Sequence, residues 1–162
     1  MDPTRALIVI DVQKGFITDD TALIPGAVQA LQADYGHVIA TRFLNPSVSQ
    51  HRKLIGWERF TPGTEEVELA FSPPEDAWVY DKTTYTAVTP ALLERLDQWG
   101  INTVDLCGIA TDGCVLKTAV DLFEAGLRPR VLSQYCASHG GPDCHQAGLT
   151  LLRRFIGERQ VV

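Results

Sequence analysis

The apolar positions of this chain follow two patterns that alternate along its length. Short continuous runs of apolar and β-branched residues indicate strands that are covered on both faces. These runs predict six strands, at residues 6–12, 37–43, 77–81, 103–108, 130–135 and 160–162. Between them, apolar residues spaced three and four apart predict helices at 27–35, 90–99, 111–124 and 144–156.

Strands that alternate with helices imply right-handed βαβ crossovers and parallel pairing. The predicted fold is therefore α/β, a three-layer α/β/α sandwich around a six-stranded, mainly parallel sheet. With 162 residues, of which 45% are hydrophobic and 21% charged, the chain has the composition of one globular domain, 1–162.

The segment 44–76 interrupts this alternation, because it holds prolines and glycines in irregular order and has only weak periodicity. A loop of this length inside a compact domain is usually functional or poorly ordered. We expect a flap over a site, with Trp57 and Phe60 in the wall of a substrate pocket. The two aromatics could equally fasten the loop to the core.

The net charge of −6 leaves no surplus of basic residues for a phosphate backbone, so nucleic acid is not an expected partner. The first apolar run, 6–10, is too short for a signal-peptide core or a membrane span. We therefore expect a cytoplasmic protein without a membrane partner.

Four cysteines are present, and without a secretory signal we expect reduced thiols. Cys107 lies inside an apolar strand and is expected in the core. Cys136, His139, Cys144 and His145 cluster within ten positions, but their spacing matches no common zinc site, so we do not expect zinc there.

Three reactive side chains follow predicted strands. Asp11 comes after the first strand, Lys82 after the third, and Cys114 begins the helix after the fourth. Ligands in open α/β sheets collect at the carboxyl ends of strands. A thiol at a helix N-terminus is expected to have a lowered pKa, and a carboxylate beside it can accept its proton. The three residues together predict a nucleophile, a base and a cation.

The segments 6–16, 80–87 and 108–115 resemble the three signature segments of the isochorismatase-like cysteine hydrolases, which include nicotinamidases and N-carbamoylsarcosine amidases. The resemblance implies the isochorismatase-like hydrolase fold and a catalytic triad of Asp11, Lys82 and Cys114. It also implies a cis peptide bond before Ala110, with an oxyanion hole formed by the N–H groups of Ala110 and Cys114.

Two further residues of the first segment are candidates for the site. Phe16 is a candidate substrate contact, although it could equally be a core aromatic. Gln13 is a candidate contact of Asp11 from behind the triad.

Relatives that resemble nicotinamidases carry an Asp-x-His metal motif after the second strand. Here the segment 41–46 reads TRFLNP, and His51 has no acidic residue within five positions. We therefore predict neither a metal nor another cofactor, and do not expect nicotinamidase activity. Isochorismatases proper lack the cysteine, so Cys114 also argues against that reaction.

The remaining hypothesis is hydrolysis of a C–N bond in a small amide, carbamoyl or ureido compound through a covalent acyl-cysteine intermediate. A redox or thiol-sensing role for Cys114 is an alternative, although the chain has no Cys-x-x-Cys pair. A non-catalytic small-molecule-binding domain is another. The resemblance further implies a homo-oligomer.

Overall fold

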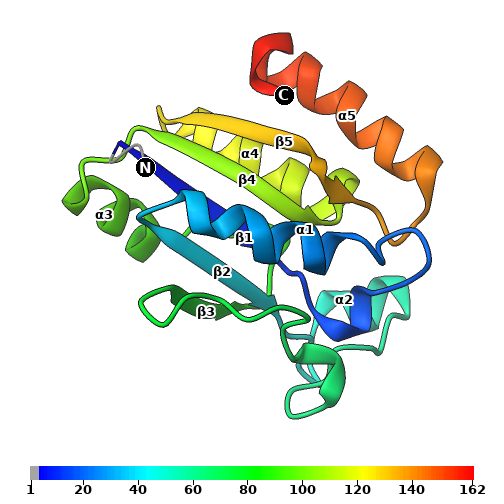
Figure 1. Ribbon diagram of the computed structural model, residues 1–162. Helices are drawn as coiled ribbons and strands as arrows, with labels where there is room; N and C mark the ends of the chain where they lie inside the picture. The colour runs from blue at the N-terminus through cyan, green and yellow to red at the C-terminus, as the bar shows by residue number, and fades with distance from the viewer. Residues whose placement is uncertain (1–3) are drawn as a thin grey trace.

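The computed structural model describes residues 4–162. Five strands form one sheet in the order β3-β2-β1-β4-β5, and every pairing between neighbours is parallel (Figure 1). The strands are β1 (Arg5–Ile10), β2 (Val38–Phe43), β3 (Trp78–Lys82), β4 (Thr103–Ile109) and β5 (Arg128–Ala137). The chain proceeds outward from β1 to β3 and then returns to the other side of β1, so the strand order reverses between β1 and β4.

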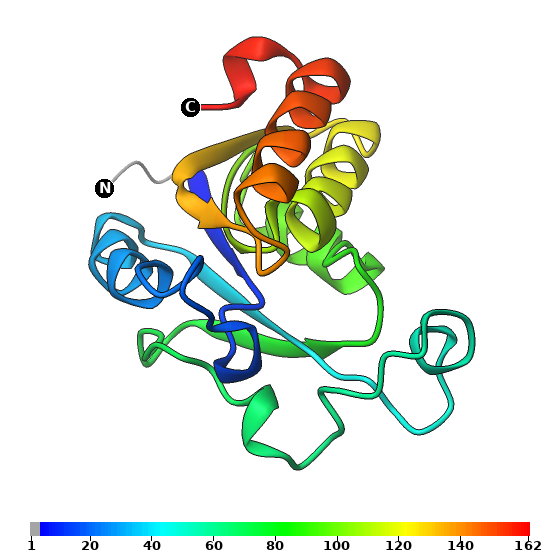
Figure 2. The ribbon, with the colours of Figure 1, turned by 90° about the vertical axis from the view of Figure 1, so that its right-hand side faces the viewer.

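Helices cover both faces of the sheet. The α-helices are α1 (Ile24–Leu31), α2 (Gln50–Ile55), α3 (Pro90–Gln98), α4 (Leu116–Glu124) and α5 (Pro142–Ile156), of which α2 lies away from the sheet on the segment after β2 (Figure 2). Single helical turns lie at Lys14–Phe16, Gln32–Asp34, Glu65–Val67 and Glu158–Gln160, and a wide π-type turn at Thr111–Val115 precedes α4. Figure 2 shows α1 on one face and α4 with α5 on the other, which confirms the predicted three-layer arrangement.

The central strands are buried because their sequences are apolar on both faces. Every residue from Ala6 to Ile10 has no exposed surface, and β4 is buried along its whole length. Ile8 pairs with Ile39 on one side and with Leu106 on the other, which fixes the register of the three central strands. No described helix is long and apolar enough to span a membrane.

The predicted sixth strand at 160–162 is wrong. The N–H of Gln160 donates to the carbonyl of Gly157, so the segment before the C-terminus closes a turn instead of extending along β5. Only the last two residues reach the sheet, where Val161 forms an isolated parallel bridge with Val131.

The flap, defined as residues 44–76, is more regular than its sequence suggested, because it contains α2. The Ser49 hydroxyl accepts a hydrogen bond from the N–H of Arg52 and caps α2 at its start. Gly56 ends the helix in the left-handed conformation, with φ of 69°. Polar residues inside α2 hide the helical periodicity, although the Ser and Gly signals were present.

Helix α5 packs directly on the wide turn that precedes α4. A Cβ added at Gly148 would lie 2.7 Å from the backbone nitrogen of Asp112, so only glycine permits this approach. The turn is thereby held against the sheet edge where the candidate reactive residues collect.

Candidate active site

Asp11, Lys82 and Cys114 come together at the carboxyl ends of the strands. Asp11 follows β1, Lys82 ends β3, and Cys114 lies in the turn between β4 and α4. The Lys82 Nζ is 2.7 Å from Asp11 Oδ2 and 3.5 Å from Cys114 Sγ. The exposed fractions of Asp11, Lys82 and Cys114 are 0%, 5% and 8%, so the three side chains are almost sealed from solvent. It lies where the strand order reverses, as expected for a site in this class of sheet.

Thr41, on β2, holds the Asp11 carboxylate. Its hydroxyl donates to Asp11 Oδ1 at 2.6 Å and accepts from the Asp11 N–H at 3.2 Å. Asp11 adopts a left-handed backbone conformation, with φ of 48°, which is uncommon for a residue other than glycine. The sequence analysis missed Thr41, although a hydroxyl inside the apolar run of the second strand was a signal for it.

Lys82 is oriented by backbone carbonyls as well as by Asp11. Its Nζ donates to the carbonyls of Thr84 and Tyr85 at 2.8 and 3.1 Å. Burial lowers the pKa of Lys82, but the Asp11 carboxylate and the Cys114 sulfur outweigh burial, so the pKa is raised. The side chain therefore stays an ammonium ion beside the sulfur.

The expectation of a lowered thiol pKa is wrong. Burial raises the pKa of Cys114, and the Asp11 carboxylate raises it further, while Lys82 opposes the rise. The lowering of the thiol pKa that a helix N-terminus would cause does not decide the outcome. The sulfur is buried and faces a negative charge, and α4 begins only at Leu116. The resting side chain is a thiol, with Asp11 as the carboxylate that can receive its proton.

The turn is folded around Ala110. The Ala110 carbonyl accepts hydrogen bonds from the N–H groups of Gly113 and Val115, and the peptide bond between Ile109 and Ala110 is cis. Ala110, Gly113 and Cys114 all line the same cavity. The backbone groups named for the oxyanion hole thus lie on the wall next to the sulfur, and their role stays a prediction.

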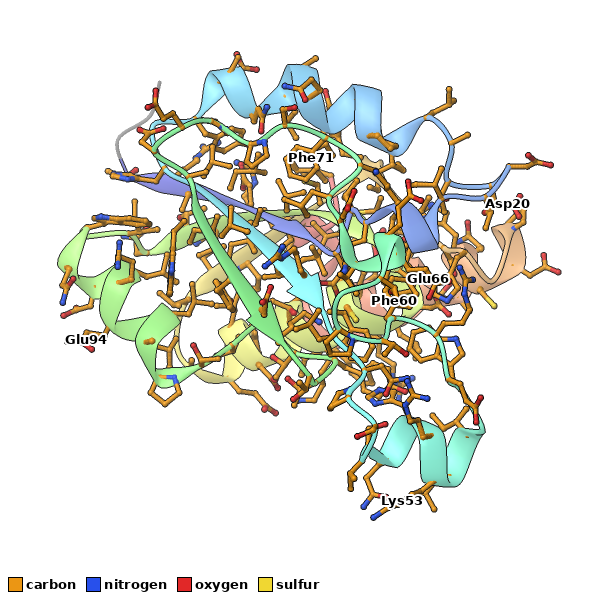
Figure 3. All side chains as sticks on the ribbon, turned by 90° about the horizontal axis from the view of Figure 1, so that it is seen from below. Asp20, Lys53, Phe60, Glu66, Phe71 and Glu94 are labelled. Atoms are coloured by element: carbon orange, nitrogen blue, oxygen red, sulfur yellow. The ribbon has the colours of Figure 1, made fainter. Side chains whose placement is uncertain are left out.

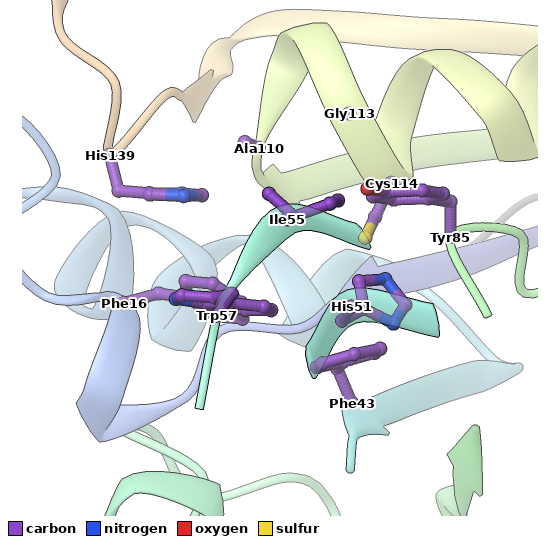
Figure 4. Close-up of a pocket in the computed structure, with 10 residues that line it drawn as sticks. All are labelled: Phe16, Phe43, His51, Ile55, Trp57, Tyr85, Ala110, Gly113, Cys114 and His139. Carbon is purple, nitrogen blue, oxygen red and sulfur yellow. The ribbon is translucent and has the colours of Figure 1, made fainter. Parts of the chain in front are cut away.

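A chamber of about 270 Å³ opens in front of the Cys114 sulfur (Figure 4). Its lining residues are Phe16, Phe43, His51, Ile55, Trp57, Tyr85, Ala110, Gly113, Cys114 and His139. Phe16 and Trp57 are therefore in the wall, as expected. Sequence reasoning missed Phe43, His51 and Tyr85 as lining residues, because no local pattern distinguishes them from core or surface positions.

The placement of Phe60 in the pocket wall is wrong. Its side chain is fully buried behind Phe16, with ring centroids 4.0 Å apart, and it does not line the chamber. The Phe60 N–H donates to Glu66 Oε2 at 2.8 Å, and Figure 3 shows both residues on the flap. Phe60 fastens the flap to the core, which was the alternative reading of this residue.

Gln13 contacts Asp11 through the backbone, where its N–H donates to the Asp11 carbonyl at 2.8 Å, while its side chain binds other residues. Its amide Nε2 donates to the carbonyls of Phe43 and Val67 at 3.0 Å each, and its Oε1 accepts the Phe43 N–H at 2.7 Å. The whole amide is committed to backbone groups, because it is buried where the end of β2 meets the flap. Gln13 ties β2 to the flap.

The donor set after β2 does not fit a metal ion. Phe43 contributes an aromatic ring to the chamber wall. The Asn45 Nδ2 donates to the carbonyls of Trp57 and Arg59 at 2.8 and 2.9 Å, and its Oδ1 accepts from Ser49 at 2.6 Å. Within residues 4–162, no group of three or more His, Cys, Asp or Glu side chains could hold a metal ion.

The cluster of Cys136, His139, Cys144 and His145 does not assemble as a site either. Cys136 is buried in β5, and His139 lines the chamber beside Phe16, at 4.8 Å between ring centroids. His145 instead shares a hydrogen bond with the Thr111 hydroxyl at 2.7 Å. Cys107 is fully buried in β4, as expected of a core residue.

Comparisons with known proteins agree with this fold. Residues 5–159 match the isochorismatase domain model. The nicotinamidase/pyrazinamidase of Mycobacterium tuberculosis is 33% identical over an aligned length of 161 residues. The alignment covers 79% of this chain and 83% of that protein. A cysteine hydrolase from Pseudomonas syringae superimposes with a TM-score of 0.84 at 24% identity, over 99% of this chain and 89% of that one. A pyrazinamidase of Pyrococcus horikoshii in complex with zinc superimposes with a TM-score of 0.82 at 23% identity, over 98% of this chain and 97% of that one.

Replacing Thr41 should expose its part in holding Asp11. Thr41→Val keeps the shape but leaves a buried carboxylate oxygen without its donor, so the free energy of unfolding should fall by about 1–3 kcal/mol. Thr41→Ser keeps the hydroxyl, so its free energy of unfolding should fall clearly less than that of Thr41→Val. Urea denaturation of the two variants measures the difference, and equal losses would contradict the assigned hydrogen bond.

Removing the Asp11 charge should make the Cys114 thiol more acidic. The carboxylate raises the pKa of Cys114, so in Asp11→Asn the thiolate should form at lower pH. The pH midpoint for alkylation of Cys114 by iodoacetamide, followed on its peptide by mass spectrometry, should therefore move down. Asp81→Asn removes an exposed carboxylate next to Lys82 in sequence and should leave the midpoint unchanged. A midpoint that stays or rises in Asp11→Asn would be inconsistent with this electrostatic coupling.

Proposed function

The chain belongs to the isochorismatase family, and from this premise we propose that it is a metal-independent cysteine amidohydrolase. It would cleave the C–N bond of a small amide, carbamoyl or ureido compound. One observation carries the proposal: the Lys82 ammonium contacts both the Asp11 carboxylate and the Cys114 sulfur, at 2.7 and 3.5 Å, and this sulfur lies in the wall of a substrate-sized chamber.

In the proposed reaction the Cys114 sulfur attacks the substrate carbonyl while Asp11 takes the thiol proton. Lys82 keeps a positive charge beside both groups, and the N–H groups of Ala110 and Cys114 would stabilise the oxyanion. When the C–N bond breaks, Asp11 returns the proton to the departing nitrogen. Asp11 then accepts a proton from water as the water oxygen attacks the thioester. The thiol recovers that proton when the acid product leaves.

This order of events suits a thiol whose pKa is raised. A preformed thiolate is not required, because the proton leaves as the bond to carbon forms. Burial of the three groups also strengthens each electrostatic interaction between them relative to water.

Metal independence rests on the segment after β2. The Pyrococcus relative is a zinc complex, whereas here Phe43 faces the chamber and Asn45 binds flap carbonyls. No step of the proposed reaction therefore passes through a metal ion. The homo-oligomer implied by the resemblance stays a prediction.

Ammonia release from a panel of small primary amides and ureido compounds tests the proposal. At least one compound should be hydrolysed, and Cys114→Ala should reduce the rate at least about 1000-fold, since members of a catalytic triad act as a unit. Cys144→Ala, which removes a partly exposed thiol outside the group of Asp11, Lys82 and Cys114, is the matched control and should keep the rate.

The same assay separates the proposal from its alternatives. A redox protein or a non-catalytic binding domain would release no ammonia from any compound. Turnover should persist after dialysis against EDTA, and loss of activity that is restored by added zinc, iron or manganese would refute metal independence. Near-normal turnover by Cys114→Ala would refute the nucleophile.

A further inference from the structure

The outer end of the flap presents large apolar side chains to solvent. Val48, Leu54 and Ile55 are 74%, 80% and 64% exposed. Lys53, beside Leu54 on α2, is exposed as well. We term these four residues the flap tip. Large apolar side chains that gather at an exposed site often mark a surface for interaction with another molecule.

The flap tip is held in this outward position by polar contacts around α2. The guanidinium of Arg52 donates through Nε to the Pro46 carbonyl at 3.0 Å, and through Nη2 to the Asn45 carbonyl at 3.2 Å. The same Nη2 also donates to the Thr61 hydroxyl at 2.7 Å, so the side chain joins the residues before α2 to those after it. Because the flap is tied at both ends of α2, its apolar tip is available to a second molecule instead of folding inward.

A groove of about 690 Å³ runs along α4 and begins at the mouth of the chamber. We term it the α4 groove. It shares Tyr85 and His139 with the chamber, which places its inner end at the chamber entrance (Figure 4). Leu116 and Val120 of α4 and the half-exposed Phe155 of α5 give it an apolar lining.

The flap tip and the α4 groove carry opposite charges. Among the residues that the structure describes, Lys53 makes no ion pair. In the groove, Asp121 is paired with Lys117. Glu124 and Asp112 also line the groove and, within residues 4–162, have no Lys or Arg partner. A basic, apolar tip therefore complements an acidic, apolar groove, and complementary charges favour and orient association.

Both surfaces lie on the same side of the molecule. Figure 2 shows α2 and α4 on that side, with α2 standing away from the sheet. Two copies related by a two-fold axis can therefore make the contact twice, the tip of each copy against the groove of the other. A two-fold interface requires this arrangement, in which one face carries both members of each contact.

We propose that this face forms a two-fold dimer in which the flap tip of each copy docks into the α4 groove of the other. The partner subunit's Leu54 packs on Phe155, and the partner subunit's Lys53 pairs with Glu124. Because the groove begins at the chamber mouth, each docked tip borders the entrance to the other copy's chamber. The surfaces are independent of the reaction at Cys114, so this inference does not rest on the proposed function.

Sedimentation velocity of charge-reversed variants tests the interface. The unchanged protein should sediment as a dimer at micromolar concentration. Lys53→Glu and Glu124→Lys should each weaken the dimer at least about 10-fold, because each places like charges at both copies of the contact. An equal mixture of the two variants should form dimers again, since every contact between positions 53 and 124 then joins opposite charges.

Matched controls reverse charges elsewhere on the surface. Figure 3 shows Glu94 at the opposite end of the molecule from Lys53, and Arg128 is an exposed residue at the start of β5. Glu94→Lys and Arg128→Glu should leave the dimer unchanged. Leu54→Asp should weaken it at least about 10-fold, because docking would bury a carboxylate in an apolar groove. The circular dichroism spectrum identifies variants that fold as the parent does, and Leu54 and Lys53 are exposed enough to be replaced without loss of packing.

Three results would overturn the proposal. The first is an unchanged protein that is monomeric at micromolar concentration, which would leave the tip and the groove to a different partner. The second is a dimer that survives Lys53→Glu, Glu124→Lys and Leu54→Asp, which would place the interface elsewhere. The third is a mixture of Lys53→Glu and Glu124→Lys that stays monomeric although each variant folds.

Discussion

The buried ion pair between Lys82 and Asp11 is the interaction on which the rest of the site depends. Neither charge could remain at this depth without the other, because an unpaired buried ion loses its hydration without compensation. The pair brings the end of β3 to the end of β1, and the reversal of strand order brings the turn after β4 to the same edge. The Cys114 thiol therefore meets a proton acceptor and a cation together. That combination gives a sulfur that is protonated at rest and has a proton acceptor beside it.

A second constraint shapes the chamber, and two buried amides supply it. Gln13 binds the backbone of Phe43 and of the flap, while Asn45 binds the carbonyls of Trp57 and Arg59. These hydrogen bonds hold the flap against the end of β2. They also engage the oxygen and the nitrogen of both side-chain amides, which are therefore not free to bind a metal ion. The cluster around Cys114 and the chamber wall in front of it are thus held by separate parts of the chain. The sheet edge holds the cluster, and the flap holds the wall.

The sequence was sufficient where local pattern determines the outcome. Continuous apolar runs specify the five strands, and the positions of Asp11, Lys82 and Cys114 after three of them place these residues at one edge. It was insufficient where tertiary contacts decide. The thiol pKa depends on burial and on Asp11, which the helix-end argument did not include.

The same limit explains the errors in the flap. The position of Phe60 depends on how the flap folds back onto the core, and the polar residues of α2 obscured its helical periodicity.

The central claim is that Cys114 carries the acyl group during turnover. Rapid-quench mass spectrometry tests it most directly, with an activated anilide whose good leaving group makes acylation faster than attack by water. The peptide that contains Cys114 should gain the mass of the acyl group within the first turnover, and the peptides of Cys107, Cys136 and Cys144 should stay unmodified. Product formation from this substrate with an unmodified Cys114 peptide throughout, or with only oxygen added to its sulfur, would contradict the account.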